Sequence, residues 1–83
     1  MNRQEIRTAV IASLLAVAPE ADAAALAPAA DLRDALDIDS MDFLRFVVGL
    51  HERLHVDIPE KDYAKVRTLE ACVEYVATKL AVA

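Results

Sequence analysis

Residues 37–50 read Asp-Ile-Asp-Ser-Met-Asp-Phe-Leu-Arg-Phe-Val-Val-Gly-Leu, and this stretch decides the fold. An acidic, turn-prone run gives way at Ser40 to an apolar pattern of helical spacing. The pattern predicts a helix over about Ser40–Leu54. Its inward face, which would form the core, consists of Phe43, Phe46, Val47, Leu50 and Leu54.

Ser40 stands at the boundary between loop and helix, and its hydroxyl has two interpretations. Serine is a preferred helix N-cap because its side-chain oxygen accepts an otherwise unpaired backbone N–H. The same position lies at the positive end of the helix dipole, where a phosphate ester is favoured. Both interpretations hold if the cap describes the unmodified chain and the ester a modified one.

A second apolar stripe on the same helix consists of Met41, Leu44 and Val48. In a small domain such a stripe is either additional core or an exposed surface where another protein docks. We favour docking, with Asp39 and Asp42 steering basic partners.

Other parts of the chain also show helical signals. Asn2 and Glu5 resemble a capping box before a helix over about residues 3–17, which Pro19 follows. Residues 18–30 form a long connection that Leu26 is expected to anchor, and Asp31 caps a short turn to about residue 36.

Downstream, residues 55–59 form an extended link, and Pro59 is expected at the first position of a brief helix over Glu60–Lys65. Tyr63 is its inward residue. Thr68 caps a last helix whose core positions are Leu69, Val73, Val76 and Leu80. The prediction is one all-α domain over residues 1–83, a four-helix bundle with three long helices and one short one.

Composition narrows the function classes. The net charge is −5, and residues 31–63 hold nine of the 14 acidic residues against four of the nine basic ones. This balance argues against nucleic acid and favours partners that present Lys and Arg. Cys72 is the single cysteine, and neither a signal-peptide pattern nor an 18-residue apolar run occurs. We expect a monomeric cytoplasmic protein without membrane insertion.

The residues give little support for catalysis or metal binding. His51 and His55 share one helix face, but no third ligand has suitable spacing. The aspartates near Ser40 lack the glycine and the glutamate of an EF-hand loop. Both histidines follow Ser40 by at least eleven positions, so no nearby base would activate its hydroxyl. We predict a partner or substrate of enzymes rather than an enzyme, with no metal site.

Asp39-Ser40-Met41 at a helix start, Val56-Asp57-Ile58-Pro59-Glu60 after that helix and Thr68-Leu69 before the last one resemble the acyl carrier proteins of the discrete bacterial type. The resemblance extends from about Leu36 to Leu80 without gaps. The first helix is similar in position and character only.

The resemblance implies that Ser40 receives 4′-phosphopantetheine from coenzyme A and that the arm's thiol carries acyl groups as thioesters. It implies that Asp39 is recognised by the phosphopantetheinyl transferase. Acyl-transfer and condensing enzymes with basic patches would dock on Met41, Asp42, Leu44, Arg45 and Val48. The acyl cavity and core would be formed by Phe43, Phe46, Val47, Leu50, Leu54 and Tyr63.

Some residues depart from the family pattern. Asp37 replaces the usual glycine before the Asp-Ser pair, and Arg45 and His51 stand where acidic residues are usual. Phe43 and Phe46 add aromatic bulk beside the usual acyl cavity. We interpret these departures as signs of a specialised carrier that serves a dedicated pathway of fatty acid, lipid or polyketide synthesis.

Three alternatives stay open at this point. A peptidyl or aminoacyl carrier is the nearest, although its motif usually has Gly-Gly where this chain has Asp37-Ile38. An unmodified helical interaction module would use Ser40 only as a cap, and Ser40→Ala separates it from a carrier. A calcium or zinc binder would show a metal-dependent thermal midpoint.

Overall fold

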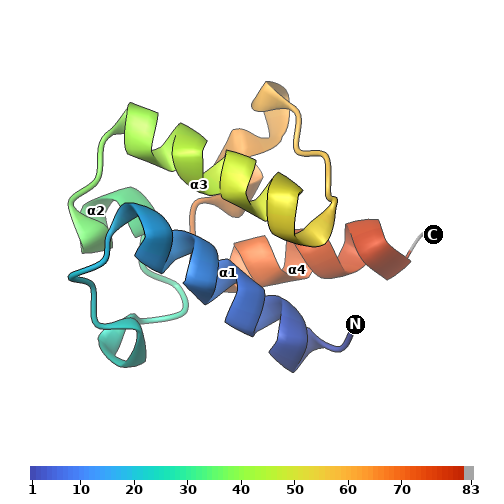
Figure 1. Ribbon diagram of the computed structural model, residues 1–83, viewed down its shortest axis with the longest axis horizontal. Coiled ribbons are helices and arrows are strands. Elements are labelled where there is room, and N and C mark those ends of the chain that lie inside the picture. Colours follow the sequence, from blue (N-terminus) through green and yellow to red (C-terminus); the bar gives the residue numbers. More distant parts are fainter. Residues whose placement is uncertain (82–83) are drawn as a thin grey trace.

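The computed structural model describes residues 1–81 (Figure 1). In chain order the elements are α1 (Arg3–Val17), η1 (Ala23–Ala25), α2 (Leu32–Leu36), α3 (Ser40–Leu54), η2 (Glu60–Val66) and α4 (Leu69–Ala81). Both η segments are 3₁₀ helices. No strand occurs in residues 1–81, where Asp31 and Thr68 form one isolated bridge. The all-α prediction is confirmed, with three long helices.

Helix α1 contacts both α3 and α4, which run in the opposite direction in Figure 1. The predicted capping box is present: Glu5 N donates to the Asn2 side chain at 2.8 Å, and Asn2 N donates to Glu5 at 3.1 Å. Ile6, Val10 and Leu14 are buried on the face toward the core. The predicted range of residues 3–17 is therefore correct.

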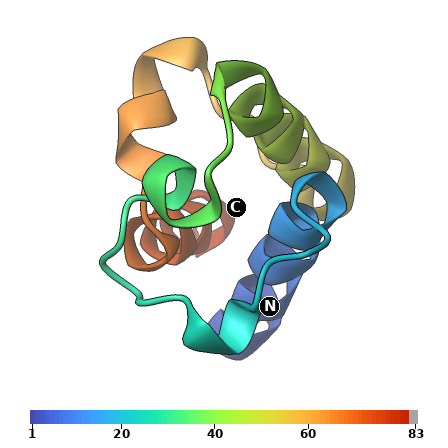
Figure 2. The ribbon, with the colours of Figure 1, turned by 90° about the vertical axis from the view of Figure 1, so that its left-hand side faces the viewer.

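The connection between α1 and α2 runs around the outside of the bundle toward α4 (Figure 2). Glu70 N donates to Pro28 O at 2.9 Å, so the connection is held against the start of α4. Leu26 is half-buried and packs on the core, as expected for an anchor. The connection then enters α2, whose N-cap is Asp31 as predicted. As a result, α2 and the start of α3 lie at one end of the molecule (Figure 1).

The core is built around α3. Phe46 and Leu50 are fully buried, and the Phe43 ring lies 5.7 Å from that of Phe46 and 6.2 Å from that of Tyr63. Aromatic pairs at such distances add to the stabilisation that burial provides. The extended link after α3 adds two buried side chains, those of Val56 and Ile58.

The segment from Pro59 to α4 differs from the prediction in detail. Pro59 is the N-cap of η2, not its first helical residue, and η2 is a 3₁₀ helix with no side-chain cap bond. 3₁₀ turns are frequent as connectors between other elements, and η2 connects α3 to α4. Thr68 does cap α4, since Ala71 N donates to its hydroxyl at 3.0 Å. Leu69, Cys72 and Val76 are buried, whereas Val73 and Leu80 are only partly so.

Asp31 ties α2 to the junction of η2 and α4. Its carboxylate accepts Arg33 N at 2.9 Å and lies 2.7 Å from Nη2 of Arg67. Burial raises the pKa of Asp31, but the bonds from Arg67 and from the backbone N–H groups outweigh it and hold the pKa below its usual 3.8. A carboxyl whose folded pKa is lowered stabilises the fold above its unfolded pKa, and this contribution is lost as pH falls through the folded pKa.

We therefore expect Asp31→Asn to lower the thermal midpoint at pH 7, where the wild type has the ion pair. Asn is an equally good N-cap, so the variant loses the charge and keeps the cap. The difference in thermal midpoint between Asp31→Asn and wild type should disappear as pH falls below 3.8. Thermal melts followed by circular dichroism between pH 7 and pH 2 would measure it. Asp31→Ala loses the cap too and should melt below Asp31→Asn throughout. A gap between Asp31→Asn and wild type that is constant with pH would contradict this account.

Candidate functional site

Ser40 is the first residue of α3 and is exposed. The predicted capping role is wrong: Asp39 is the N-cap, with extended backbone at φ −92° and ψ −176°. The Asp39 carboxylate accepts Asp42 N at 2.9 Å. Aspartate caps as well as serine does, so the preceding residue takes the role and the helix starts with Ser40 inside it.

The Ser40 hydroxyl takes no part in the hydrogen bonds found among residues 1–81. It stands in the first turn of a fifteen-residue helix, where backbone N–H groups and the helix dipole favour negative charge. The structure thus places an exposed, uncommitted hydroxyl where a phosphate ester would be stabilised.

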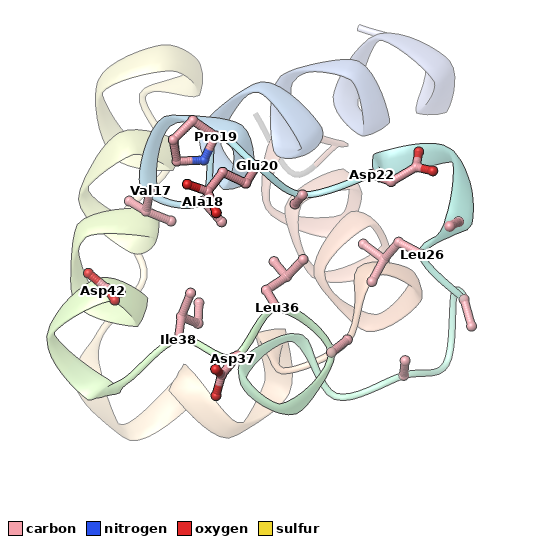
Figure 3. Close-up of a pocket in the computed structure, with 15 residues that line it drawn as sticks. Val17, Ala18, Pro19, Glu20, Asp22, Leu26, Leu36, Asp37, Ile38 and Asp42 are labelled. Atoms are coloured by element: carbon pink, nitrogen blue, oxygen red, sulfur yellow. The ribbon is translucent and has the colours of Figure 1, made fainter.

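Two cavities flank this position. The first, which we call the acidic cavity, has a volume of about 690 Å³ and lies between the α1–α2 connection, α2 and the start of α3. Figure 3 shows Val17, Leu36 and Ile38 around it, with Asp37 and Asp42 at its edge. Glu20 and Asp22 also line it, and no Lys or Arg does.

The second cavity, which we call the Ser40 groove, has a volume of about 400 Å³ and lies between α3 and η2. Ser40 itself lines it, together with the aromatic side chains of Phe43 and Tyr63. Two arginines also line it: Arg33, which belongs to α2, and Arg67, which directly follows η2. Phe43 is buried and Tyr63 half-buried, so the groove is a surface feature above a filled aromatic core.

The outer side of α3 exposes its second apolar stripe. Met41 is 62% exposed, Leu44 39% and Val48 46%, the largest exposed apolar side chains besides Met1. These three side chains border a shallow depression that reaches Ala16 of α1. Arg45 is exposed on the same side, and its guanidinium lies 3.9 Å from the Asp42 carboxylate.

The inward side of α3 buries all five side chains that the periodicity assigned to it. The two arginines of the Ser40 groove were missed, because they are 34 positions apart and belong to different elements. No local pattern indicates such a pair. His51 and His55 have structural surroundings: His51 Nδ1 lies 3.2 Å from Val56 O, and His55 caps the C-terminus of α3 with φ 54°.

Asp37 ends α2 in the left-handed conformation at φ 52° and ψ 46°. Glycine adopts this conformation without a steric cost, and aspartate is among the residues that tolerate it best. The loop before Ser40 therefore has the backbone that a glycine would favour, and the extra carboxylate lines the acidic cavity.

The sequence matches the family described as Phosphopantetheine attachment site over residues 6–76. The chain belongs to the acyl carrier protein family. An acyl carrier protein of Thermosynechococcus vestitus is 30% identical to it, over 98% of this chain and 99% of the relative. Those of Rubrobacter xylanophilus and Syntrophobacter fumaroxidans are 32% and 34% identical, over 92% and 82% of this chain and 93% and 79% of the relatives.

Acyl carrier proteins carry their cargo on 4′-phosphopantetheine and are not themselves catalysts. The residues of this chain fit that group, because an exposed serine hydroxyl stands in the first turn of a long helix and lines the Ser40 groove. The thioester chemistry belongs to the arm's thiol, and the protein supplies its attachment and surroundings. No helix within residues 1–81 has the length and apolarity to cross a membrane.

Proposed function

We propose that Ser40 bears 4′-phosphopantetheine and that this protein presents acyl thioesters to the enzymes of a dedicated biosynthetic pathway. The observation that carries the proposal is the free Ser40 hydroxyl in the first turn of α3, next to a cap that another residue supplies. In the loading step Ser40 Oγ attacks the pyrophosphate phosphorus of coenzyme A that bears pantetheine, so that a new O–P bond forms and the P–O bond to the adenosine half breaks. The serine proton is lost to the transferase, and adenosine 3′,5′-bisphosphate leaves.

The phosphodiester so formed would lie at the α3 N-terminus. The interaction of its negative charge with the helix dipole is worth typically about 0.3–1 kcal/mol. Asp39 supports the arrangement because its carboxylate fixes the first turn by accepting Asp42 N. The same exposed carboxylate offers the transferase a negative charge beside the nucleophile.

Cys72 makes the test of loading simple. It is fully buried, and burial raises the pKa of its thiol to about 12, so the unmodified protein has no reactive thiolate near neutral pH. Incubation with coenzyme A and a broad-specificity phosphopantetheinyl transferase should add one phosphopantetheinyl mass and one thiol that reacts with Ellman's reagent. A chain that gains neither would refute the proposed function.

We further propose that partner enzymes dock on a face of α3 formed by Met41, Asp42, Leu44, Arg45 and Val48, called the docking face below. The exposed apolar stripe supplies the contact area, and Asp39 and Asp42 attract basic patches on the transferase and on acyl-transfer and condensing enzymes. Arg45 adds a positive charge in the middle of this face, which supports partners other than the ordinary fatty acid enzymes. We place this monomeric carrier in the cytoplasm.

Leu44→Asp tests the docking face. In the complex this substitution would place a carboxylate where an apolar contact is buried, so it should raise the transferase KM for the unmodified protein about tenfold. The melting temperature should be nearly unchanged, because Leu44 is exposed in the free protein. Thr8→Asp places the same charge on an exposed position of α1 and is the matched control. Equal KM values for the two variants would contradict a role of this face in the transferase encounter.

A further inference from the structure

The two cavities beside Ser40 differ sharply in charge. The acidic cavity is lined by four carboxylates, those of Glu20, Asp22, Asp37 and Asp42, and by no basic side chain. The Ser40 groove is lined by Arg33 and Arg67, with Glu60 as its one carboxylate. An anionic group attached to Ser40 is therefore repelled on one side of the helix start and finds cations on the other.

Arg67 is held in place by neighbours. Its Nη2 lies 2.7 Å from the Asp31 carboxylate, and its guanidinium carbon lies 6.0 Å from the centre of the Phe43 ring. Its side chain is nevertheless 37% exposed, and Asp31 engages a single terminal nitrogen. The buried Nε has no hydrogen-bond partner in residues 1–81. Such a fixed guanidinium offers further N–H donors at low entropic cost.

Arg33 is the freer of the two cations. Its side chain is half-buried and forms no ion pair within residues 1–81. Its backbone N–H donates to Asp31, the N-cap of α2, and its C=O accepts from Asp37 N at the end of α2. Because Asp31 offsets part of the Arg67 charge, the uncompensated positive charge of the groove resides mainly on Arg33. A substitution of the Arg33 side chain leaves both backbone roles intact.

We propose that the Ser40 groove binds an anionic group tethered to Ser40, with Arg33 and Arg67 as its partners. Two sources supply such a group: the phosphodiester of the arm itself, and a carboxylate at the end of a short acyl cargo. The Phe43 and Tyr63 rings form the apolar surface against which the chain between thioester and carboxylate lies. This inference rests on Ser40 bearing the arm.

The experiment compares four forms of the protein: unmodified, holo, butyryl and succinyl. The last two are made with butyryl- and succinyl-coenzyme A and the same transferase, and they differ only in a terminal methyl or carboxylate. The step from unmodified to holo adds the phosphodiester, and the step from butyryl to succinyl adds the carboxylate. Melting temperatures and NMR shifts of the Arg33 and Arg67 Nε–Hε groups are measured for every form.

We expect the succinyl form to melt about 2–4 °C above the butyryl form at low salt, as one partly exposed ion pair in a domain of this size would give. The difference should disappear in Arg33→Gln and shrink in 0.5 M salt. Arg7→Gln, an equal charge change on α1 away from the groove, should retain it. An Arg33-dependent gain at the holo step alone would identify the phosphodiester as the bound anion.

The proposal is overturned if neither step depends on Arg33, so that wild type, Arg33→Gln and Arg7→Gln give the same shifts in melting temperature and leave the arginine signals in place. That outcome differs from failure of the proposed function, in which none of the forms gains mass and no comparison between cargoes arises. Intact masses recorded before each melt separate the two.

Discussion

Ser40→Ala should abolish loading while the fold persists. The variant lacks the only hydroxyl in the first turn of α3, so coenzyme A and transferase should add neither mass nor a reactive thiol. Asp39 remains as the N-cap, and alanine is the best helix former, so the melting temperature should change by less than about 2 °C. A variant that loses all modification and almost none of its stability identifies an attachment residue rather than a structural one.

The control for this variant is Thr8→Ala, which removes an exposed helical hydroxyl from α1 and should load like the wild type. Uptake of a phosphopantetheinyl group by Ser40→Ala would assign the attachment to another residue. A large fall in melting temperature would show instead that Ser40 has the capping role that the sequence suggested and the structure gives to Asp39.

Sequence patterns predict the bounds of α3 but not the residue that caps it. The bounds of α3 follow from the spacing of its apolar residues, which is a property of the helix itself. The choice between Asp39 and Ser40 as cap does not, because both side chains are suited to the role and stand next to each other. Only the backbone conformation, extended at Asp39 and helical from Ser40 onward, decides between them.

The surroundings of Ser40 were less predictable than its position. The Ser40 groove depends on where α2 and η2 come to lie, and the bridge between Asp31 and Thr68 and the bond from Leu32 N to Arg67 O, 2.7 Å long, bring those segments together. These are contacts between distant parts of the chain, which periodicity does not encode. The burial of Val56 and Ile58 was missed for another reason, because the five-residue link that contains them is too short to show a pattern.

Phe46→Ala should have the largest effect on stability. Phe46 is fully buried at the centre of α3, and its ring packs at a tilt against that of Phe43, so truncation leaves a cavity and should cost about 3–5 kcal/mol. An 83-residue domain has a total stability of roughly 4–12 kcal/mol, so this loss would lower the melting temperature by about 15–30 °C. Urea unfolding followed by circular dichroism measures both quantities.

Phe46→Leu is the matched control, because leucine keeps most of the apolar volume and should cost only about 1–1.5 kcal/mol. Similar, small losses for both variants would show that the core collapses around the gap and that the aromatic pair adds little. If the large difference is found, the aromatic bulk of Phe46 holds α3 in place. Phe46 supports the Phe43 ring, which lines the Ser40 groove, so a short cargo would be kept at the surface, within reach of Arg33.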